Sequence, residues 1–167
     1  MTGFETENAG VQPITYNLKL KTYNPLMDFD ELYQEIILDH SKRPRNSGVL
    51  PPPATRGSGY NPACGDEVTV FVLKSPEGKI ETVSFQAQAC AICTASTSLM
   101  TLQVKGTTQE QALALQRHFI DFLTKDGPSE GLGHLRALAG VKKFPQRLKC
   151  ATLGWHALEA ALKDATE

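Results

Sequence analysis

The sequence predicts an α+β domain, because a strand hairpin stands early in the chain and helical segments follow it. The hairpin pattern consists of two segments with alternating apolar and polar side chains, EVTVFVLK (67–74) and ETVSFQAQA (81–89), joined by the turn SPEGKI (75–80). Several helical patterns follow residue 90. With 167 residues, the chain has the length of one domain and needs no cross-links to fold.

The segments ahead of the hairpin predict an extension, a helix and a loop. Residues 1–26 are polar without a sustained period, so we expect a flexible extension before a functional domain at 27–167; only ITYNLKL (14–20) alternates like an edge strand. Residues 28–42 predict a helix with a capping-box pattern at Asp28 and Glu31, ended by Pro44. Residues 43–66, rich in proline and glycine, predict a long loop, which in a compact domain is usually functional.

The segments after the hairpin predict helices. Residues 93–106 form a pattern of small residues that ends at Gly106, and 107–127 begin with a threonine cap, Thr107 or Thr108. A short third segment follows at 129–140. The last helix is predicted over 144–164, with Pro145 in its first turn.

Charge and hydropathy exclude several classes of partner. The net charge is 17 − 18 = −1, which argues against a protein that binds mainly nucleic acid or an acidic membrane surface. No segment approaches the length of a membrane span, and no secretory signal is visible. We therefore expect a cytoplasmic protein, in which cysteines are more often metal ligands or catalytic thiols than disulfides.

Three of the four cysteines lie at boundaries between predicted elements. Cys64 precedes the hairpin in NPACGDE (61–67), Cys90 follows its second strand, and Cys150 lies early in the last helix. We expect these thiols to converge at one end of the sheet, where Asp66 adds a carboxylate. Three thiolates and a carboxylate suit a tetrahedral zinc site. The alternative, in which the later cysteines are small core residues, stays open on spacing alone.

Cys90 and Cys93 also form a C-x-x-C pair between a strand and a helix, where thioredoxin-like redox sites occur. That fold requires βαβ units and a parallel sheet, whereas here a hairpin precedes the pair. We therefore interpret Cys93 as a buried thiol rather than half of a dithiol redox enzyme. An alternative metal ligand and a resolving thiol for a sulfur on Cys90 are the other readings that stay open.

Four stretches together resemble the NifU/IscU-like iron–sulfur cluster assembly family, and within it the SufU branch. They are ELYQEIILDHSKRPRN, NPACGDEVTV, ACAICTAST and FPQRLKCATLGWHALEAAL, and the similarity extends from Met27 to Lys163. The resemblance implies a small antiparallel sheet of about three strands packed against several helices. Three features resemble SufU proteins: the long segment 105–140, Arg147, and Lys149 where IscU-type scaffolds carry a histidine.

The resemblance implies sulfur transfer in iron–sulfur cluster biogenesis. The implied zinc ligands are Cys64, Asp66, Cys90 and Cys150. Cys64 would accept persulfide sulfur from a pyridoxal-phosphate-dependent cysteine desulfurase of the SufS type, whose own histidine replaces Cys64 on the zinc. The sulfur would then pass to the downstream assembly machinery or to a thiol acceptor. We expect Arg147 to stabilise a thiolate or persulfide nearby.

Two other functions use the same ligands. The chain could be a scaffold that assembles a transient [2Fe–2S] cluster, since thiolates suit iron as well as zinc. It could also be a purely structural zinc domain, in which the thiols matter only for stability.

Overall fold

The computed structural model describes residues 29–164 and confirms the α+β class. The expected extension 1–26, its strand pattern at 14–20 and the expected cap Asp28 lie outside the described residues. The described elements are α2 (Phe29–Lys42), β1 (Thr55–Asn61), β2 (Asp66–Lys74), β3 (Ile80–Gln88), α3 (Ala91–Val104), α4 (Gln109–Lys125), the 3-10 helix η2 (Gly133–Lys143) and α5 (Pro145–Asp164).

The sheet is antiparallel and has the strand order β1-β2-β3. The predicted hairpin is confirmed as β2 and β3. The prediction of one long loop over 43–66 is wrong, because residues 55–61 form β1 and pair with β2 along its length. The sequence of β1, TRGSGYN, has no apolar alternation, so periodicity could not reveal it.

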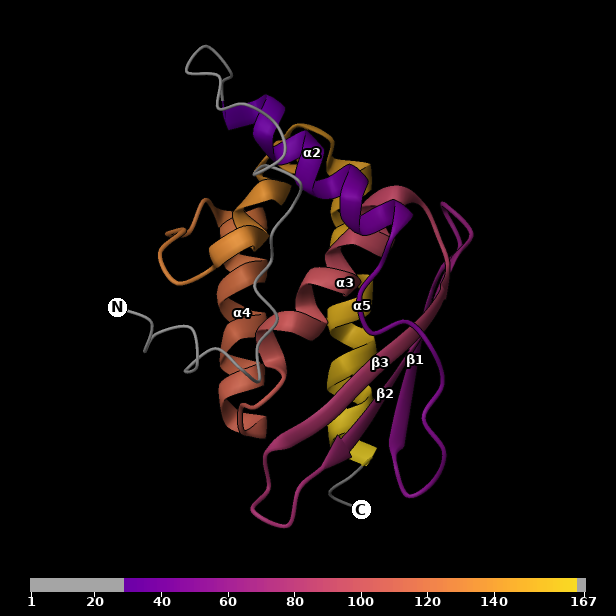
Figure 1. The fold of residues 1–167 in the computed structure, drawn as a ribbon. Helices are drawn as coiled ribbons and strands as arrows, with labels where there is room; N and C mark the ends of the chain where they lie inside the picture. Colours follow the sequence, from indigo (N-terminus) through magenta and orange to yellow (C-terminus); the bar gives the residue numbers. More distant parts are fainter. Residues whose placement is uncertain (1–28, 165–167) are drawn as a thin grey trace, which may run out of the picture.

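Helix α5 packs against β1, and glycine at position 57 makes this possible. A Cβ atom on Gly57 would overlap the backbone of Ala157 and Ala161 and would lie 2.7 Å from the Cβ of Ala160. Figure 1 shows the sheet on one side of the molecule, α4 on the other, and α3 and α5 between them. The core therefore lies around α5, where Trp155 is fully buried with its ring centroid 5.2 Å from that of Phe119.

The predicted helices after the hairpin are confirmed. The capping box of α4 is complete: the Thr108 hydroxyl accepts from the Gln111 backbone N–H, and the Gln111 side chain accepts from the Thr108 N–H. The segment expected at 129–140 becomes η2, which ends at Lys143. No helix in the described part of the chain is both long and apolar enough to cross a membrane.

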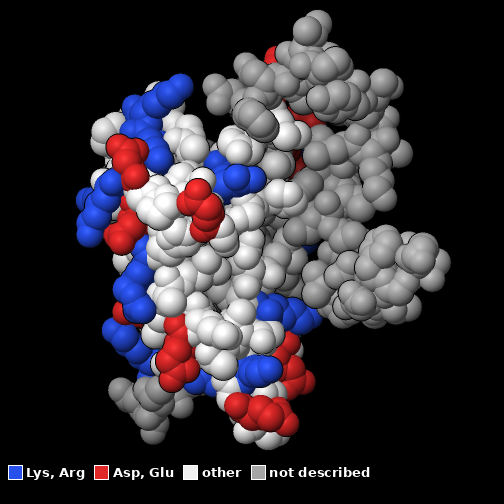
Figure 2. All heavy atoms as spheres, turned by 90° about the vertical axis from the view of Figure 1, so that its left-hand side faces the viewer, with Lys and Arg blue, Asp and Glu red and all other residues white. Residues whose placement is uncertain are grey.

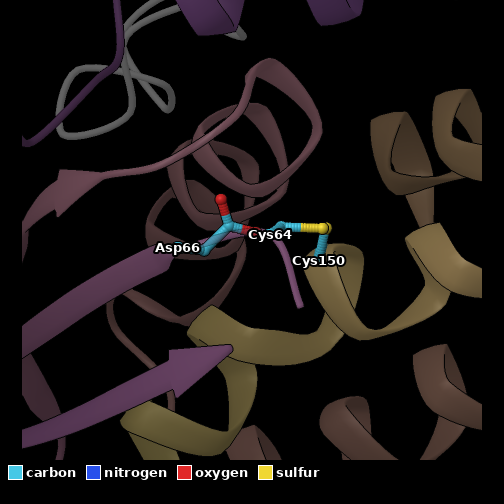
Figure 3. Close-up of side chains that lie close together, drawn as sticks. All are labelled: Cys64, Asp66 and Cys150. Carbon is cyan, nitrogen blue, oxygen red and sulfur yellow. The ribbon is translucent and has the colours of Figure 1, made fainter. Parts of the chain in front are cut away.

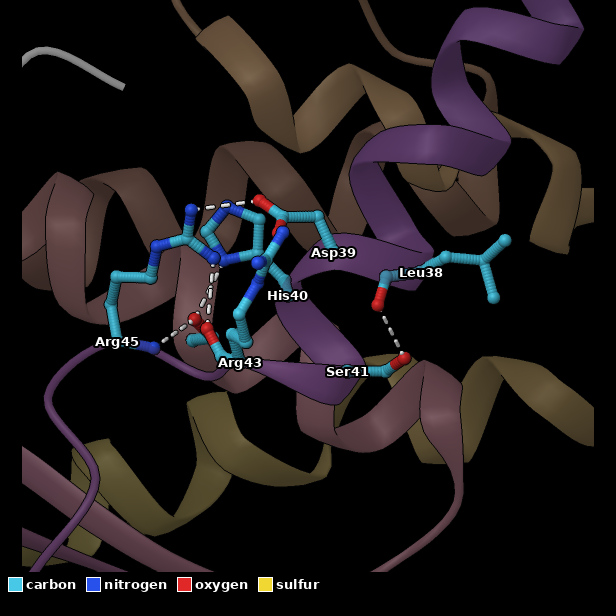
Figure 4. Close-up of polar contacts among 7 residues, drawn as sticks. Leu38, Asp39, His40, Ser41, Arg43 and Arg45 are labelled. Atoms are coloured by element: carbon cyan, nitrogen blue, oxygen red, sulfur yellow. Dashed lines mark hydrogen bonds and ion pairs between the residues drawn. The ribbon is translucent and has the colours of Figure 1, made fainter. Parts of the chain in front are cut away.

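A buried histidine ties α2 to α3. The Nδ1 atom of His40 lies 2.6 Å from the Ser98 hydroxyl, which also accepts the backbone N–H of Arg45 at 2.8 Å. Burial, reinforced by the charge of Arg45, lowers the pKa of His40 to about 4, so its imidazole is neutral at neutral pH. Burial alone would raise the pKa of Asp39. The hydrogen bonds and positive charges of Arg45 and Arg43 outweigh burial and hold this pKa below its usual value (Figure 4).

We predict that Gly57→Ala destabilises the protein, because the added methyl group meets the backbone of α5, which cannot move aside. The expected loss is about 1–3 kcal/mol in the free energy of unfolding, measured by urea denaturation. Gly59→Ala is the matched control on the same strand. Its added Cβ would lie 2.9 Å from the flexible end of Leu153, so the loss is smaller. Equal stabilities of the two variants would contradict the predicted contact.

We also predict that stability falls as the pH drops from about 6.5 to about 4. Within this window the unfolded chain binds a proton at residue 40, while the folded protein, with its lowered His40 pKa, does not. The full loss is about 3 kcal/mol, since one pKa unit corresponds to about 1.4 kcal/mol. The free energy of unfolding, taken from denaturation curves at several pH values in this window, should fall more steeply with decreasing pH in wild type than in His40→Gln. His156→Gln, at an exposed site, should show the same pH dependence as wild type. The same pH dependence of the unfolding free energy in wild type and His40→Gln would rule the effect out.

Candidate metal centre

Cys64 lies in the tight turn that joins β1 to β2. It was expected in a long loop ahead of the hairpin, but the turn comprises only residues 62–65, because Asn61 pairs with Asp66 across the sheet. The Asn61 carbonyl accepts the backbone N–H groups of Cys64 at 3.2 Å and Gly65 at 2.7 Å. Gly65 adopts a φ of 73°, which favours glycine. The turn leaves Cys64 exposed.

Asp66 is the first residue of β2, and the residue is only 1% exposed. Its Oδ1 atom accepts the backbone N–H of Cys90 at 2.9 Å, and its Oδ2 atom lies 3.8 Å from the Cys90 sulfur. Cys90 occupies the N-cap position of α3. A carboxylate at a helix N-terminus is favoured by the backbone N–H groups and the helix dipole. Asp66 therefore links the sheet to α3 and holds its carboxylate beside a thiol.

Cys150 brings a third thiol to the same point from α5. It is fully buried, and its sulfur lies 3.3 Å from that of Cys64. Donor atoms of Cys64, Asp66 and Cys150 all lie within 4.8 Å of one another. Figure 3 shows the three side chains close together. The expected group of three thiols and a carboxylate is thus present in part: Cys64, Asp66 and Cys150 lie mutually close, whereas Cys90 lies outside this set and contacts Asp66.

The spacing of these donors fits a tetrahedral metal ion. Ligands about 2.0–2.3 Å from a zinc ion lie roughly 3.3–3.8 Å from one another. Two sulfurs on one zinc lie near the upper end of this interval, so the Cys64–Cys150 sulfur pair, at 3.3 Å, is about 0.5 Å closer than zinc-bound sulfurs. A rotation of the exposed Cys64 side chain can open this distance, and the Cys90–Asp66 pair, at 3.8 Å, is already at the upper end. The residues Cys64, Asp66, Cys90 and Cys150 could therefore hold zinc.

The electrostatics of the centre also suit a cation. Burial, followed by the hydrogen bonds to Asp66 and Cys64, raises the pKa of the Cys150 thiol above its usual range. A thiol in such surroundings loses its proton most readily when a metal cation takes the proton's place. The guanidinium of Arg147, expected near the thiols, is exposed one turn before Cys150. The nearby Cys90 and Cys150 raise its pKa.

Cys93 lies one turn into α3, and its side chain is 0% exposed. Burial raises the pKa of its thiol to about 12, with smaller contributions from Asp66 and Cys90. Its backbone carbonyl accepts the Thr97 hydroxyl at 2.8 Å. These features agree with the interpretation of Cys93 as a buried thiol.

Asn61 contacts the centre, although the sequence analysis did not single it out. It is 5% exposed, and its Nδ2 atom lies 3.7 Å from the Cys150 sulfur. The available signal was the dipeptide Asn61-Pro62, since asparagine before proline often starts a turn. That signal locates the turn, but the contact with Cys150 depends on how α5 packs.

The surface beside the turn contains a basic residue, Lys149. A depression of about 290 Å³ lies between the turn and α5; it is lined by Tyr60, Asn61, Pro62, Ala63, Lys149, Thr152, Leu153 and His156. On the face shown in Figure 2, by contrast, basic and acidic side chains are interspersed, as the net charge suggests.

Comparison with known proteins identifies relatives over most of the chain. The family model of the NifU-like N-terminal domain matches residues 32–167. The iron–sulfur cluster assembly scaffold protein IscU of Streptococcus pyogenes is 43% identical over 140 residues, which cover 83% of this chain and 87% of the relative. The zinc-dependent sulfurtransferase SufU of Bacillus subtilis is 41% identical over 134 residues, which cover 79% and 90%.

A solved structure has the same fold. It is described as an iron–sulfur cluster assembly scaffold protein for the SUF system of Fervidobacterium islandicum AW-1, and it superposes with a TM-score of 0.72 at 35% sequence identity. The match covers 77% of this chain and 94% of the other.

We predict that the thiols of the metal-free protein react with iodoacetamide at very different rates. Cys64 is exposed and should react first, whereas Cys93 is buried with a pKa of about 12. At neutral pH, a thiol of that pKa has about a thousandfold less thiolate than one of pKa 9.0. Mass spectrometry of timed samples measures each rate, and concentrated guanidinium chloride should remove the difference. Equal rates in the folded protein would contradict the placement of Cys93.

Proposed function

We propose a function for this chain from one premise: the chain belongs to the NifU-like N-terminal domain family. In our proposal it is an iron–sulfur cluster biogenesis protein that takes up persulfide sulfur on Cys64. The donor is a pyridoxal-phosphate-dependent cysteine desulfurase of the SufS type, and the sulfur passes on to the downstream assembly machinery or to a thiol acceptor.

The observation that carries this proposal is the unequal exposure of the four donor residues. Cys64 is exposed on a turn, whereas Asp66 and Cys150 are buried and Cys90 is half-buried at the start of α3. A persulfide on another protein can reach only a sulfur at the surface. Cys64 is therefore the acceptor, while the other donor residues stay within the fold.

The metal ligands in this proposal are Cys64, Asp66, Cys90 and Cys150. A bound zinc ion would keep the thiols deprotonated without supplying redox chemistry of its own. The proposal also draws on the zinc-dependent sulfurtransferase of Bacillus subtilis, which is 41% identical to this chain.

The transfer itself conserves atoms and electrons. The Cys64 thiolate attacks the outer sulfur of the donor's persulfide, the donor's S–S bond breaks, and a new S–S bond forms on Cys64. The donor cysteine departs as a thiolate, so nothing is oxidised or reduced overall. Arg147 supports this step, since a guanidinium close to the thiols stabilises the negative charge on sulfur.

A scaffold function is the second candidate. The Streptococcus pyogenes relative, 43% identical, is described as a cluster assembly scaffold protein, and the same four donors could hold a transient [2Fe–2S] cluster. A purely structural zinc domain remains the third reading, but it assigns no role to the exposure of Cys64.

We predict that Cys64→Ser removes sulfur uptake. The chain purified without added metal should contain about one zinc ion and no iron–sulfur absorption. Incubated with a SufS-type desulfurase and cysteine that is radiolabelled on its sulfur atom, wild type should gain labelled sulfur that a reductant releases. Cys64→Ser should fall to the level of a reaction without the chain, because the exposed sulfur is gone, and Cys93→Ser, the matched control, should behave as wild type.

The other outcomes separate the alternatives. Iron with sulfide and a brown colour after anaerobic reconstitution, with no label on Cys64, would favour the scaffold. Zinc without any label on Cys64 would leave the structural domain. Loss of sulfur uptake in Cys93→Ser would point to dithiol chemistry instead.

A further inference from the structure

The side chain of Asn61 lies between the turn that carries Cys64 and the helix that carries Cys150. It is 5% exposed, so both ends of its amide need partners inside the protein. The Oδ1 atom accepts the backbone N–H of Ala63 at 3.2 Å, and the Nδ2 atom lies 3.7 Å from the Cys150 sulfur.

The orientation of this amide follows from its partners. The backbone N–H of Ala63 can only donate, so the oxygen of Asn61 must face it, and the NH₂ group must face Cys150. An N–H donor suits a deprotonated or metal-bound sulfur, which can only accept. The amide is therefore arranged for Cys150 in its thiolate form.

The backbone of Asn61 has a separate effect on the turn. Its carbonyl accepts the N–H groups of Cys64 and Gly65, and these two bonds direct the Cys64 side chain outward. One residue thus contacts both cysteines, through different groups: the side chain holds the Cys150 sulfur, and the main chain shapes the turn that exposes Cys64.

We propose that Asn61 is a positioning residue of the metal centre, whose amide holds the Cys150 sulfur as an anchored ligand and so leaves Cys64 as the reactive one. This inference rests on the proposed function, since it assumes that the four donors bind a metal. Groups that hydrogen-bond to metal ligands orient them, and their loss typically lowers metal affinity 10–100-fold.

Two variants separate the side-chain contact from the shape of the turn. Asn61→Ser can still accept the Ala63 N–H through its hydroxyl, but it is too short to reach Cys150. Asn61→Asp keeps the shape of the side chain and the oxygen that accepts the Ala63 N–H, and it replaces the NH₂ donor with a second oxygen. All variants retain the backbone carbonyl. Ser58→Ala is the matched control, because it lies on the same strand and loses one contact, to Thr69 at 3.0 Å.

The experiment measures zinc affinity by competition with a chromophoric chelator, and the alkylation rate of each cysteine in the zinc-loaded protein by mass spectrometry. In wild type and Ser58→Ala, Cys64 should react first. In Asn61→Ser and Asn61→Asp, zinc affinity should fall about tenfold or more, and alkylation of Cys150 should rise relative to that of Cys64. A change in overall stability alone would not change which of the two cysteines is alkylated faster.

The outcomes are decisive without any desulfurase. If both variants bind zinc as wild type does and Cys64 still reacts first, the role of Asn61 is refuted while the proposed function stands. If wild type binds no zinc, the proposed function fails and the inference fails with it. Should Asn61→Ser lose its metal-free fold, as seen by circular dichroism, the isosteric Asn61→Asp decides the question.

Discussion

The hydrogen bond from the backbone N–H of Cys90 to the Asp66 carboxylate is the contact on which the candidate centre depends. It joins the first residue of β2 to the N-cap of α3, 24 residues further along the chain. A charge-assisted bond of this kind is stronger than one between neutral groups, and burial strengthens it further. By satisfying one carboxylate oxygen, it aims the other at the Cys90 sulfur, so two of the four donors are placed by a single interaction.

The other two donors are placed by the packing of α5 on β1. The helix axis can approach the strand because Gly57 has no side chain to separate them. This approach places Cys150 against the turn that follows β1, where its sulfur meets that of Cys64. The tight turn thus supplies Cys64, the start of β2 supplies Asp66, and two different helices supply Cys90 and Cys150.

The parts that the sequence predicted correctly are those with a local signal. The β2–β3 hairpin and the helices have clear periodicities, and Thr108 and Gln111 form a readable capping box. Strand β1 could not be predicted in this way, because its glycines serve a contact with α5 that is about a hundred residues away. Cys64 was consequently placed in a long loop. The positions of Cys64 and Cys150 at element boundaries predicted that these two thiols meet, whereas the contact between Asn61 and Cys150 depends on tertiary packing alone.

The unequal surroundings of the donors connect the fold to the choice between functions. A ligand set with equivalent thiols would serve a scaffold or a structural site equally well. Here the sulfur of Cys64 is at the surface, that of Cys150 is buried beside an amide donor, and Cys90 lies against a carboxylate. A structural site gains nothing from an exposed ligand, since exposure invites oxidation and exchange. An acceptor of sulfur requires it, because the incoming sulfur must meet one thiol while the others keep the centre together.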